Sequence, residues 1–147
     1  MTIFIGADHR GLELKNAIIE YLHEKNIRIE DLGTYELAPL DDMVDYSRKV
    51  AQAVLQNPEK HFGIIICGSG CAAGMAANRM KGIRAGLAMN TKQAVHIREN
   101  DHANVLLLAS DYTPLEEAHK IVDAFFSANP KVDEKYLRRI QKLDNEV

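Results

Sequence analysis

The residue best suited to chemistry in this sequence is Cys67, which ends the apolar run 63–66 and precedes the turn Gly-Ser-Gly at 68–70. Such a run is typical of a strand buried on both faces of a parallel sheet, and the small residues 71–78 then favour a helix. A strand, a turn and a helix in this order aim backbone N–H groups and a positive dipole end at an anion. A thiol placed there loses its proton more easily than in water, so Cys67 is a candidate base or nucleophile. The alternative is a small buried hydrophobe, which most free cysteines are.

Other cysteine and phosphate chemistries fit this motif less well. Three residues separate Cys71 from Cys67, whereas a redox pair needs two, so we expect Cys71 to pack in the interior. Residues 68–73 match the G-x-G-x-x-A pattern of dinucleotide folds, but the strand expected at 83–88 is not followed by a carboxylate that could hold a ribose. The motif that remains is a cradle of N–H groups for an oxyanion.

Two further groups of polar residues stand out. Asp8 and His9 follow the apolar run 2–6. Asp8 could simply cap the next helix, but a histidine beside it at the end of a strand equally indicates a polar site. A basic group shares one helix face through its i, i+3 and i+4 spacing: Lys135, Arg138 and Arg139. That face would be merely solvated unless its helix reaches a phosphate.

The elements that position these residues alternate between strand and helix, which predicts an α/β fold with a parallel sheet and helices on both faces. We expect strands at residues 2–6, 27–32, 63–67, 83–88 and 105–109. We expect helices ending near 25, at 46–56, 71–78 and 91–99, from Pro114 to about 128, and at 133–143. Ligands of such folds bind at the carboxyl ends of the strands, so Asp8, His9 and Cys67 should share one cleft.

Composition excludes several classes of function. The chain has 147 residues, which suits a single domain, and its formal net charge of −3 gives no indication of nucleic acid binding. No apolar run is long enough to span a membrane. Two cysteines without a secretory segment favour a protein of the reducing cytoplasm over a disulfide scaffold.

A resemblance to a known family extends over nearly the whole chain. The segments that carry it are 5–15, 31–34, 63–78, 82–85, 104–106 and 121–125. Together they resemble the type B ribose-5-phosphate isomerase family, which includes the galactose-6-phosphate isomerase subunits; Gly-Ala-Asp-His at 6–9 and Ile-Cys-Gly-Ser-Gly at 66–70 are its most specific parts. The resemblance implies a three-layer α/β/α sandwich around a five-stranded, parallel, Rossmann-like sheet. It also implies a homodimer or homotetramer with sites between subunits, helix 133–143 packed on the partner, a sugar phosphate substrate, and no cofactor or metal.

The resemblance also implies a role for each matching residue in an aldose–ketose isomerisation. Cys67 would be the base that moves a proton between C1 and C2 of the open-chain sugar, and Ser69 would help to move the proton in ring opening. The backbone around the glycine turn would hold the enediolate: Gly68, Gly70, Cys71, Ala72, Ala73 and Gly74. Asp8 would bind sugar hydroxyls. The phosphate would be held by His9 and by a partner's basic helix: Lys135, Arg138 and Arg139.

Several positions depart from the family pattern. Asn100 stands where the family has the histidine that opens the furanose ring, and an amide cannot act as a general acid or base near neutral pH. His102, two residues further on, is the candidate to replace it. Ala72 stands in place of a glycine, and Asp111 in place of an arginine that binds phosphate.

Three hypotheses therefore remain open at the level of sequence. The chain interconverts ribose 5-phosphate and ribulose 5-phosphate with altered supporting residues; or it isomerises another sugar or sugar phosphate, such as a hexose 6-phosphate; or it is a sugar-phosphate-binding subunit without activity of its own.

Overall fold

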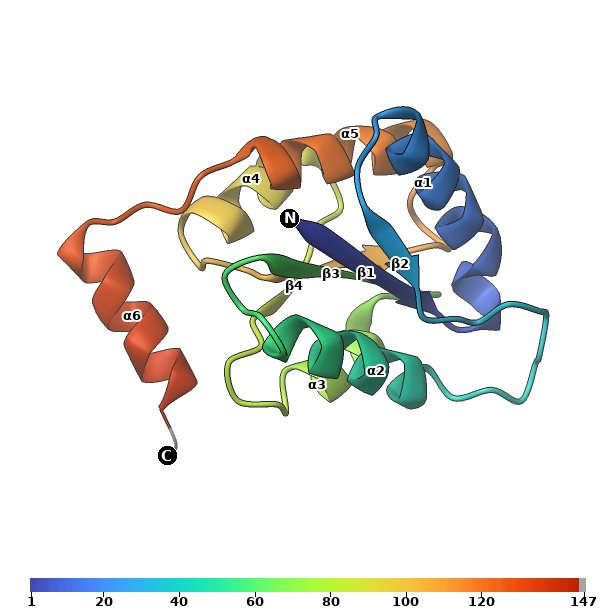
Figure 1. The fold of residues 1–147 in the computed structure, drawn as a ribbon, viewed down its shortest axis with the longest axis horizontal. Helices are drawn as coiled ribbons and strands as arrows, with labels where there is room; N and C mark the ends of the chain where they lie inside the picture. The colour runs from blue at the N-terminus through green and yellow to red at the C-terminus, as the bar shows by residue number, and fades with distance from the viewer. Residues whose placement is uncertain (146–147) are drawn as a thin grey trace.

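The computed structural model describes residues 1–145 and has three layers, a central sheet with helices on both of its faces (Figure 1). Its strands are β1 (Thr2–Ala7), β2 (Ile29–Asp31), β3 (His61–Cys67), β4 (Ala85–Leu87) and β5 (Val105–Ala109). All neighbouring strands are parallel, and they lie in the order β2-β1-β3-β5-β4. The five-stranded α/β sandwich expected from the sequence is confirmed.

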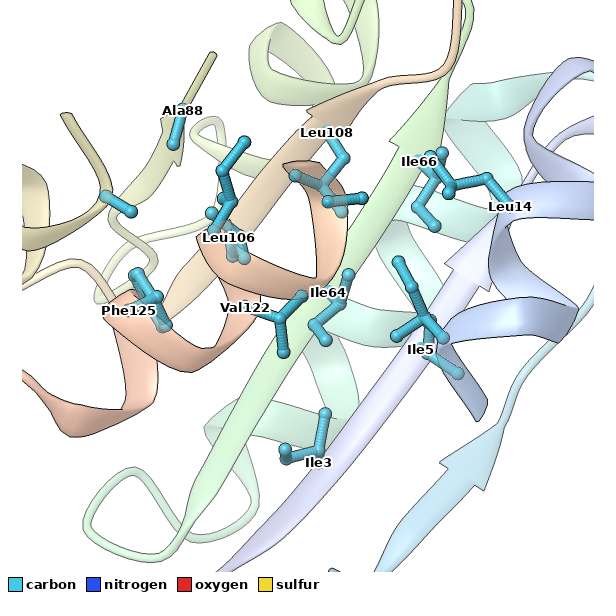
Figure 2. Packing of buried hydrophobic residues seen from close by; sticks show 14 of the residues in the cluster. Ile3, Ile5, Leu14, Ile64, Ile66, Ala88, Leu106, Leu108, Val122 and Phe125 are labelled. Atoms are coloured by element: carbon cyan, nitrogen blue, oxygen red, sulfur yellow. The ribbon is translucent and has the colours of Figure 1, made fainter. Parts of the chain in front are cut away.

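The helices divide between the two faces of the sheet. They are α1 (Leu12–Glu24), α2 (Met43–Leu55), α3 (Cys71–Ala77), α4 (Thr91–Glu99), α5 (Leu115–Ser127) and α6 (Glu134–Asp144). In Figure 1, α1, α4 and α5 cover one face while α2 and α3 cover the other. Figure 2 shows the first of these interfaces, where side chains of the strands meet those of α1 and α5: Ile3, Ile5, Ile64, Ile66, Leu106, Leu108, Leu14, Val122 and Phe125.

The register of the central strands decides which side chains meet at the carboxyl edge. Side chains alternate along a strand, so Ile64 and Ile66 pack toward α1 and α5, whereas Ile65 and Cys67 face α2 and α3. Because Ala7 pairs with Ile66, the next residue on each strand, Asp8 and Cys67, lie side by side where β1 and β3 end. The sequence prediction that these two strand ends are neighbours is confirmed.

Some element boundaries differ from those expected. The strands expected at 27–32 and 83–88 are reduced to Ile29–Asp31 and Ala85–Leu87. Both lie at the edges of the sheet, where a strand pairs on one side only and short strands are common. Helix α2 begins at Met43, earlier than the expected 46, because Met43 packs against the core of its face.

Lys15 is the charged residue among the buried positions of α1, and it is fully buried. Its Nζ forms an ion pair with Asp31 at the end of β2. A buried ammonium is tolerated only when it is paired in this way, so this contact fixes α1 against the edge of the sheet.

Helix α6 stands apart from the sheet and its covering helices (Figure 1). No residue of Glu134–Asp144 is buried, although the helix and its approach carry the exposed apolar side chains Val132, Leu137 and Leu143. Its contacts with the body include an ion pair of 2.6 Å between Arg84 and Asp144. Among residues 1–145, no helix combines the length and apolar character needed to cross a membrane.

Candidate active site

A cavity of about 380 Å³ opens at the carboxyl edge of the sheet. It lies over the ends of β1, β3 and β5, where the chain turns from each strand toward the next helix. The lining residues come from these turns and from the start of α2: Asp8, Arg10, Met43, Cys67, Gly68, Ser69, Ala72, Asp111 and Tyr112. The cleft predicted from the sequence is thus present, with Asp8 and Cys67 in one wall.

Cys67 is mostly buried but reaches the cavity. Its relative exposure is 4%, and the backbone N–H of Gly70 donates a hydrogen bond of 3.1 Å to its Sγ. Gly70 has a φ of +75° and starts α3, a conformation that strains residues carrying a Cβ. This N–H donor holds the sulfur in place where β3 turns into α3, at the wall of the cavity.

The N–H groups expected to hold an oxyanion are only partly free. The N–H of Gly70 is used by the sulfur of Cys67, that of Cys71 donates to Ser69 Oγ at 3.3 Å, and that of Gly74 donates to the carbonyl of Gly70 at 3.2 Å. The N–H of Gly74 thus closes the first turn of the helix, and the role of the backbone of 68–74 in holding the enediolate stays a prediction. Ala72 and Ala73 are in the first turn, where a helix offers no acceptor of its own.

The side chains of Ser69 and Cys71 are both at the surface. Ser69 lines the cavity. Its hydroxyl oxygen accepts from the N–H of Cys71, which leaves the hydroxyl proton available for donation. Cys71 was expected to pack in the interior, but its thiol is exposed. The helix turns that side chain outward, and Ala73 and Ala77 take the core positions.

Asp8 combines the two roles that the sequence left open. Its Oδ1 accepts hydrogen bonds of 3.0 and 3.2 Å from the N–H groups of Arg10 and Gly11, so it caps the 3₁₀ turn His9–Gly11. It also lines the cavity, although only 7% of the residue is exposed. Burial raises the pKa of this carboxyl above its ordinary value of 3.8, against the opposing effect of those two hydrogen bonds.

His9 lies next to the cavity and is fixed by Asp41, a residue without a role in the sequence analysis. Its Nδ1 is 2.7 Å from Asp41 Oδ1, and its backbone N–H donates to the same oxygen at 3.3 Å. The other carboxylate oxygen of Asp41 is buried and has no hydrogen-bond partner among the described residues. The loop before α2, which contains Asp41, thus orients the imidazole of His9. The sequence of the loop does not indicate this contact.

Arg10 and Asp111 form an ion pair across the mouth of the cavity. Arg10 follows His9 directly and had no role in the sequence predictions. A Cβ placed on Gly68 would lie 2.8 Å from Arg10 Nε and 2.9 Å from Asp111 Oδ2, so the pair rests directly on the turn that follows Cys67. Only glycine leaves room for it there.

Two of the predicted catalytic residues, Asn100 and His102, do not reach this cavity within one chain. They precede β5, whose other end, Ala109, is the partner of Cys67 in the sheet. From Val105 to Ala109 the strand covers about 13 Å, so these residues lie at the opposite, amino edge. Asn100 accepts a hydrogen bond of 2.9 Å from Lys131 Nζ, and His102 Nε2 lies 2.8 Å from the carbonyl of Lys131.

The basic group of α6 is equally remote from Cys67 in its own chain. Lys135, Arg138 and Arg139 are exposed, and α6 departs from Lys131, which the contacts of Asn100 and His102 fix at the amino edge. One chain therefore brings Asp8, Cys67, Gly68, Ser69 and Ala72 together around the cavity, with His9 next to Asp8 in the chain but not among the lining residues. Asn100, His102 and the basic residues of α6 lie elsewhere. Residues 1–145 contain no group of three His, Cys, Asp or Glu side chains that could hold a metal ion.

Comparison with known proteins agrees with this arrangement. The family model described as Ribose/Galactose Isomerase matches residues 3–143. A probable ribose-5-phosphate isomerase B of Mycoplasma pneumoniae is 47% identical over 126 residues, which are 86% of this chain and 82% of that protein. The crystal structure of ribose-5-phosphate isomerase B from Mycoplasma genitalium with bound ribulose-5-phosphate has a TM-score of 0.93 and 42% identity, covering 97% of this chain and 93% of that one. The structure of the enzyme of the same name from Thermotoga maritima has a TM-score of 0.92 and 41% identity, with 97% of each chain covered.

Fold and cavity together define the class of protein: an α/β protein with a small-molecule site at the carboxyl edge of a parallel sheet. Within that class, the chain belongs to the ribose/galactose isomerase family. The family resemblance drawn from the sequence is confirmed.

Proposed function

We propose that this protein is an aldose–ketose isomerase that interconverts ribose 5-phosphate and ribulose 5-phosphate through an enediolate. The observation that carries the proposal is the position of the Cys67 sulfur, which lies beside Asp8 in a cavity that also contains the start of α3. Relatives that share 42–47% of their residues with this chain are called ribose-5-phosphate isomerase B, and one has ribulose-5-phosphate bound. The reaction needs no cofactor, and we assign it to the cytoplasm because both cysteines are free thiols.

The proposed chemistry is a proton transfer between neighbouring carbons. The thiolate of Cys67 removes the proton from C2 of the open-chain aldose, and the electron pair of that C–H bond forms a C1–C2 double bond while charge moves to O1. N–H groups of Ala72 and Ala73 stabilise this oxyanion, which a fixed donor can do by a few kcal/mol. Cys67 then returns the proton to C1 while the O2 hydroxyl proton passes to O1, so that C2–O2 becomes the carbonyl of the ketose and C1–O1 a hydroxyl. Asp8 binds the sugar hydroxyls nearby.

The proposed site is completed by a second copy of the chain. Asn100, His102 and the basic face of α6 lie at the edge of the sheet opposite Cys67, so they can serve a site only across a subunit interface. We assign the phosphate to His9 of one copy and to Lys135, Arg138 and Arg139 of the other. Ring opening falls to Ser69 and to His102, since Asn100 cannot transfer a proton. The resulting assembly is a homodimer or a pair of dimers.

The role of Cys67 is tested by Cys67→Ala, with ribose 5-phosphate to ribulose 5-phosphate turnover as the measurement. Removing the base should lower kcat by about 100-fold or more, the usual contribution of a positioned base. The matched control is Ile65→Val, a small truncation on the same face of the same strand, which should leave kcat within about 2-fold while costing about 0.5–1.5 kcal/mol of stability. Undiminished turnover in Cys67→Ala would rule the assignment out.

The substrate is tested by following deuterium from solvent into C1 or C2 of pentose and hexose phosphates and of their unphosphorylated forms. We expect exchange to be fastest with ribose 5-phosphate. Faster exchange into a hexose 6-phosphate would show that the enzyme has a different substrate but uses the same proton-transfer mechanism. Binding without any exchange would show a sugar-phosphate-binding subunit and would refute the proposed enzyme.

A further inference from the structure

The ionisable side chains that line the cavity are poorly matched to a phosphate if they are considered singly. Two of them are the carboxylates Asp8 and Asp111, and the cation among the lining residues of the described chain is Arg10. An unpaired Asp111 would repel a dianion, as its sequence position suggests. In the structure, however, Asp111 is paired with Arg10, so its charge is offset within the cavity mouth.

The contacts around Arg10 fix it at both ends. Ser110 Oγ donates a hydrogen bond of 3.0 Å to the carbonyl of Arg10, and Asp111 accepts from Nη2 at the tip of the side chain. The end of β5 is itself anchored to the turn after Cys67: the N–H groups of Ser110 and Asp111 donate to the carbonyls of Cys67 and Gly68, each at 3.0 Å. The guanidinium is therefore held at a defined place over the turn.

The pair remains accessible to a ligand. The side chain of Arg10 is 57% exposed and that of Asp111 is 34% exposed. A guanidinium carries five N–H donors in one plane, and Asp111 engages the Nη2 end, so donors remain that can grip two oxygens of a phosphate at once. A carboxylate that occupies part of the fork fixes the plane in which the free donors point.

We propose that Arg10, oriented by Asp111, is a further phosphate-binding residue that acts beside His9 at the mouth of its own chain's cavity. The inference rests on the proposed function for the identity of the ligand. Arg10 acts as a binding residue, and Asp111 is a positioning residue whose charge Arg10 neutralises. In this chain the guanidinium thus comes from Arg10 in the turn after β1, while Asp111, after β5, supplies the carboxylate that pairs with it.

A double-mutant cycle with Arg10→Leu and Asp111→Asn tests the proposal. Ribose 5-phosphate, inorganic phosphate and free ribose are titrated by calorimetry, and kcat and KM are measured in parallel. Arg10→Leu should weaken binding of both phosphate compounds by about 10- to 100-fold, the usual value of a hydrogen bond to a charged group, with a much smaller change for ribose. The loss should appear in KM more than in kcat. Arg28→Leu is the matched control, because Arg28 is also an exposed arginine paired with a carboxylate, Glu30, but it precedes β2, away from the cavity.

The sign of the Asp111→Asn effect decides between the proposed role and a merely structural ion pair. In the parent protein, Asp111→Asn should weaken phosphate binding because Arg10 loses its orientation. In the Arg10→Leu background the same change should strengthen binding, because it removes an uncompensated carboxylate. The same sign in both backgrounds, or equal losses for ribose and ribose 5-phosphate in Arg10→Leu, would overturn the inference. If the parent binds phosphate through Arg10 but does not isomerise ribose 5-phosphate, the proposed function fails while this inference stands. If the parent binds neither phosphate compound, both fail.

Discussion

At the scale of one residue, Asp8 both caps a turn and lines the cavity. Its Oδ1 closes the turn into α1, while its burial beside Cys67 raises its pKa. An asparagine would keep the accepting oxygen but would not ionise, so the two contributions can be separated by a single substitution.

We expect Asp8→Asn to be more stable than the parent near neutral pH, with a difference that disappears in acid. Because the pKa of Asp8 is raised in the folded state, ionisation of this carboxyl destabilises the parent protein. The parent has its full stability below the unfolded-state pKa of about 3.9 and loses part of it as pH rises through the folded-state pKa. Urea unfolding of both proteins between about pH 3.5 and pH 7 measures this. Glu59→Gln, at an exposed position, is the control. A difference between Asp8→Asn and the parent that is constant with pH, or that grows in acid, would contradict the expectation.

At the scale of the element, the turn from β3 into α3 depends on the backbone of Gly70. Its φ of +75° directs an N–H group at the sulfur of Cys67, and a Cβ there would lie 2.6 Å from Leu87 Cδ1. The glycine thus links the position of the Cys67 sulfur to the packing of the edge strand β4.

We expect Gly70→Ala to lose stability and activity together, by about 1–2 kcal/mol for the backbone conformation alone and by at least about 10-fold in kcat as the N–H moves off the sulfur. Gly82→Ala is the matched control, since Gly82 has a φ of +87° but lies in the turn before β4. Gly82→Ala should lower the free energy of unfolding by an amount similar to that of Gly70→Ala, and it should leave kcat nearly unchanged. Equal losses of kcat in the two variants would show that the turn has no special part in catalysis.

Contacts within an element or between paired strands could be predicted from the sequence, whereas contacts between distant side chains could not. The apolar run before Cys67 predicted its strand, and parallel pairing of the strands then places Asp8 beside Cys67. The pair Arg10–Asp111 joins residues 101 apart in the chain, and His9–Asp41 depends on the path of an irregular loop. No period or propensity specifies such contacts. The burial of Lys15 likewise depends on a partner from another element, Asp31.

At the scale of the whole molecule, the proposed site needs parts from both edges of the sheet. We expect Arg139→Ala to weaken binding of ribose 5-phosphate by about 10- to 100-fold and to leave free ribose much less affected. Equal losses for both sugars would refute the phosphate assignment. Titration calorimetry measures both, and Arg28→Leu again serves as the control.

Mixing inactive variants tests whether that arginine acts across subunits. Cys67→Ala and Arg139→Ala are each expected to be impaired as homodimers. In a mixed dimer one site has lost both residues, whereas the other keeps Cys67 from one copy and Arg139 from the other. Unfolding and refolding the two variants together should therefore restore up to about one quarter of the parent activity per chain, because half of the dimers are then mixed and each has one intact site. No recovery would place both residues in the same chain's site.

The position of α6, beyond the edge of the sheet that is opposite the thiol, has a consequence for kinetics. In the assembly we propose, a solitary chain would hold the two halves of different sites and complete neither. When the chain is dilute, turnover then follows the square of its concentration, and only above the dissociation constant of the dimer does it become proportional. In the dilute range, the activity of such an enzyme rises more steeply than its concentration. A fall in expression therefore lowers the activity by more than a proportional amount.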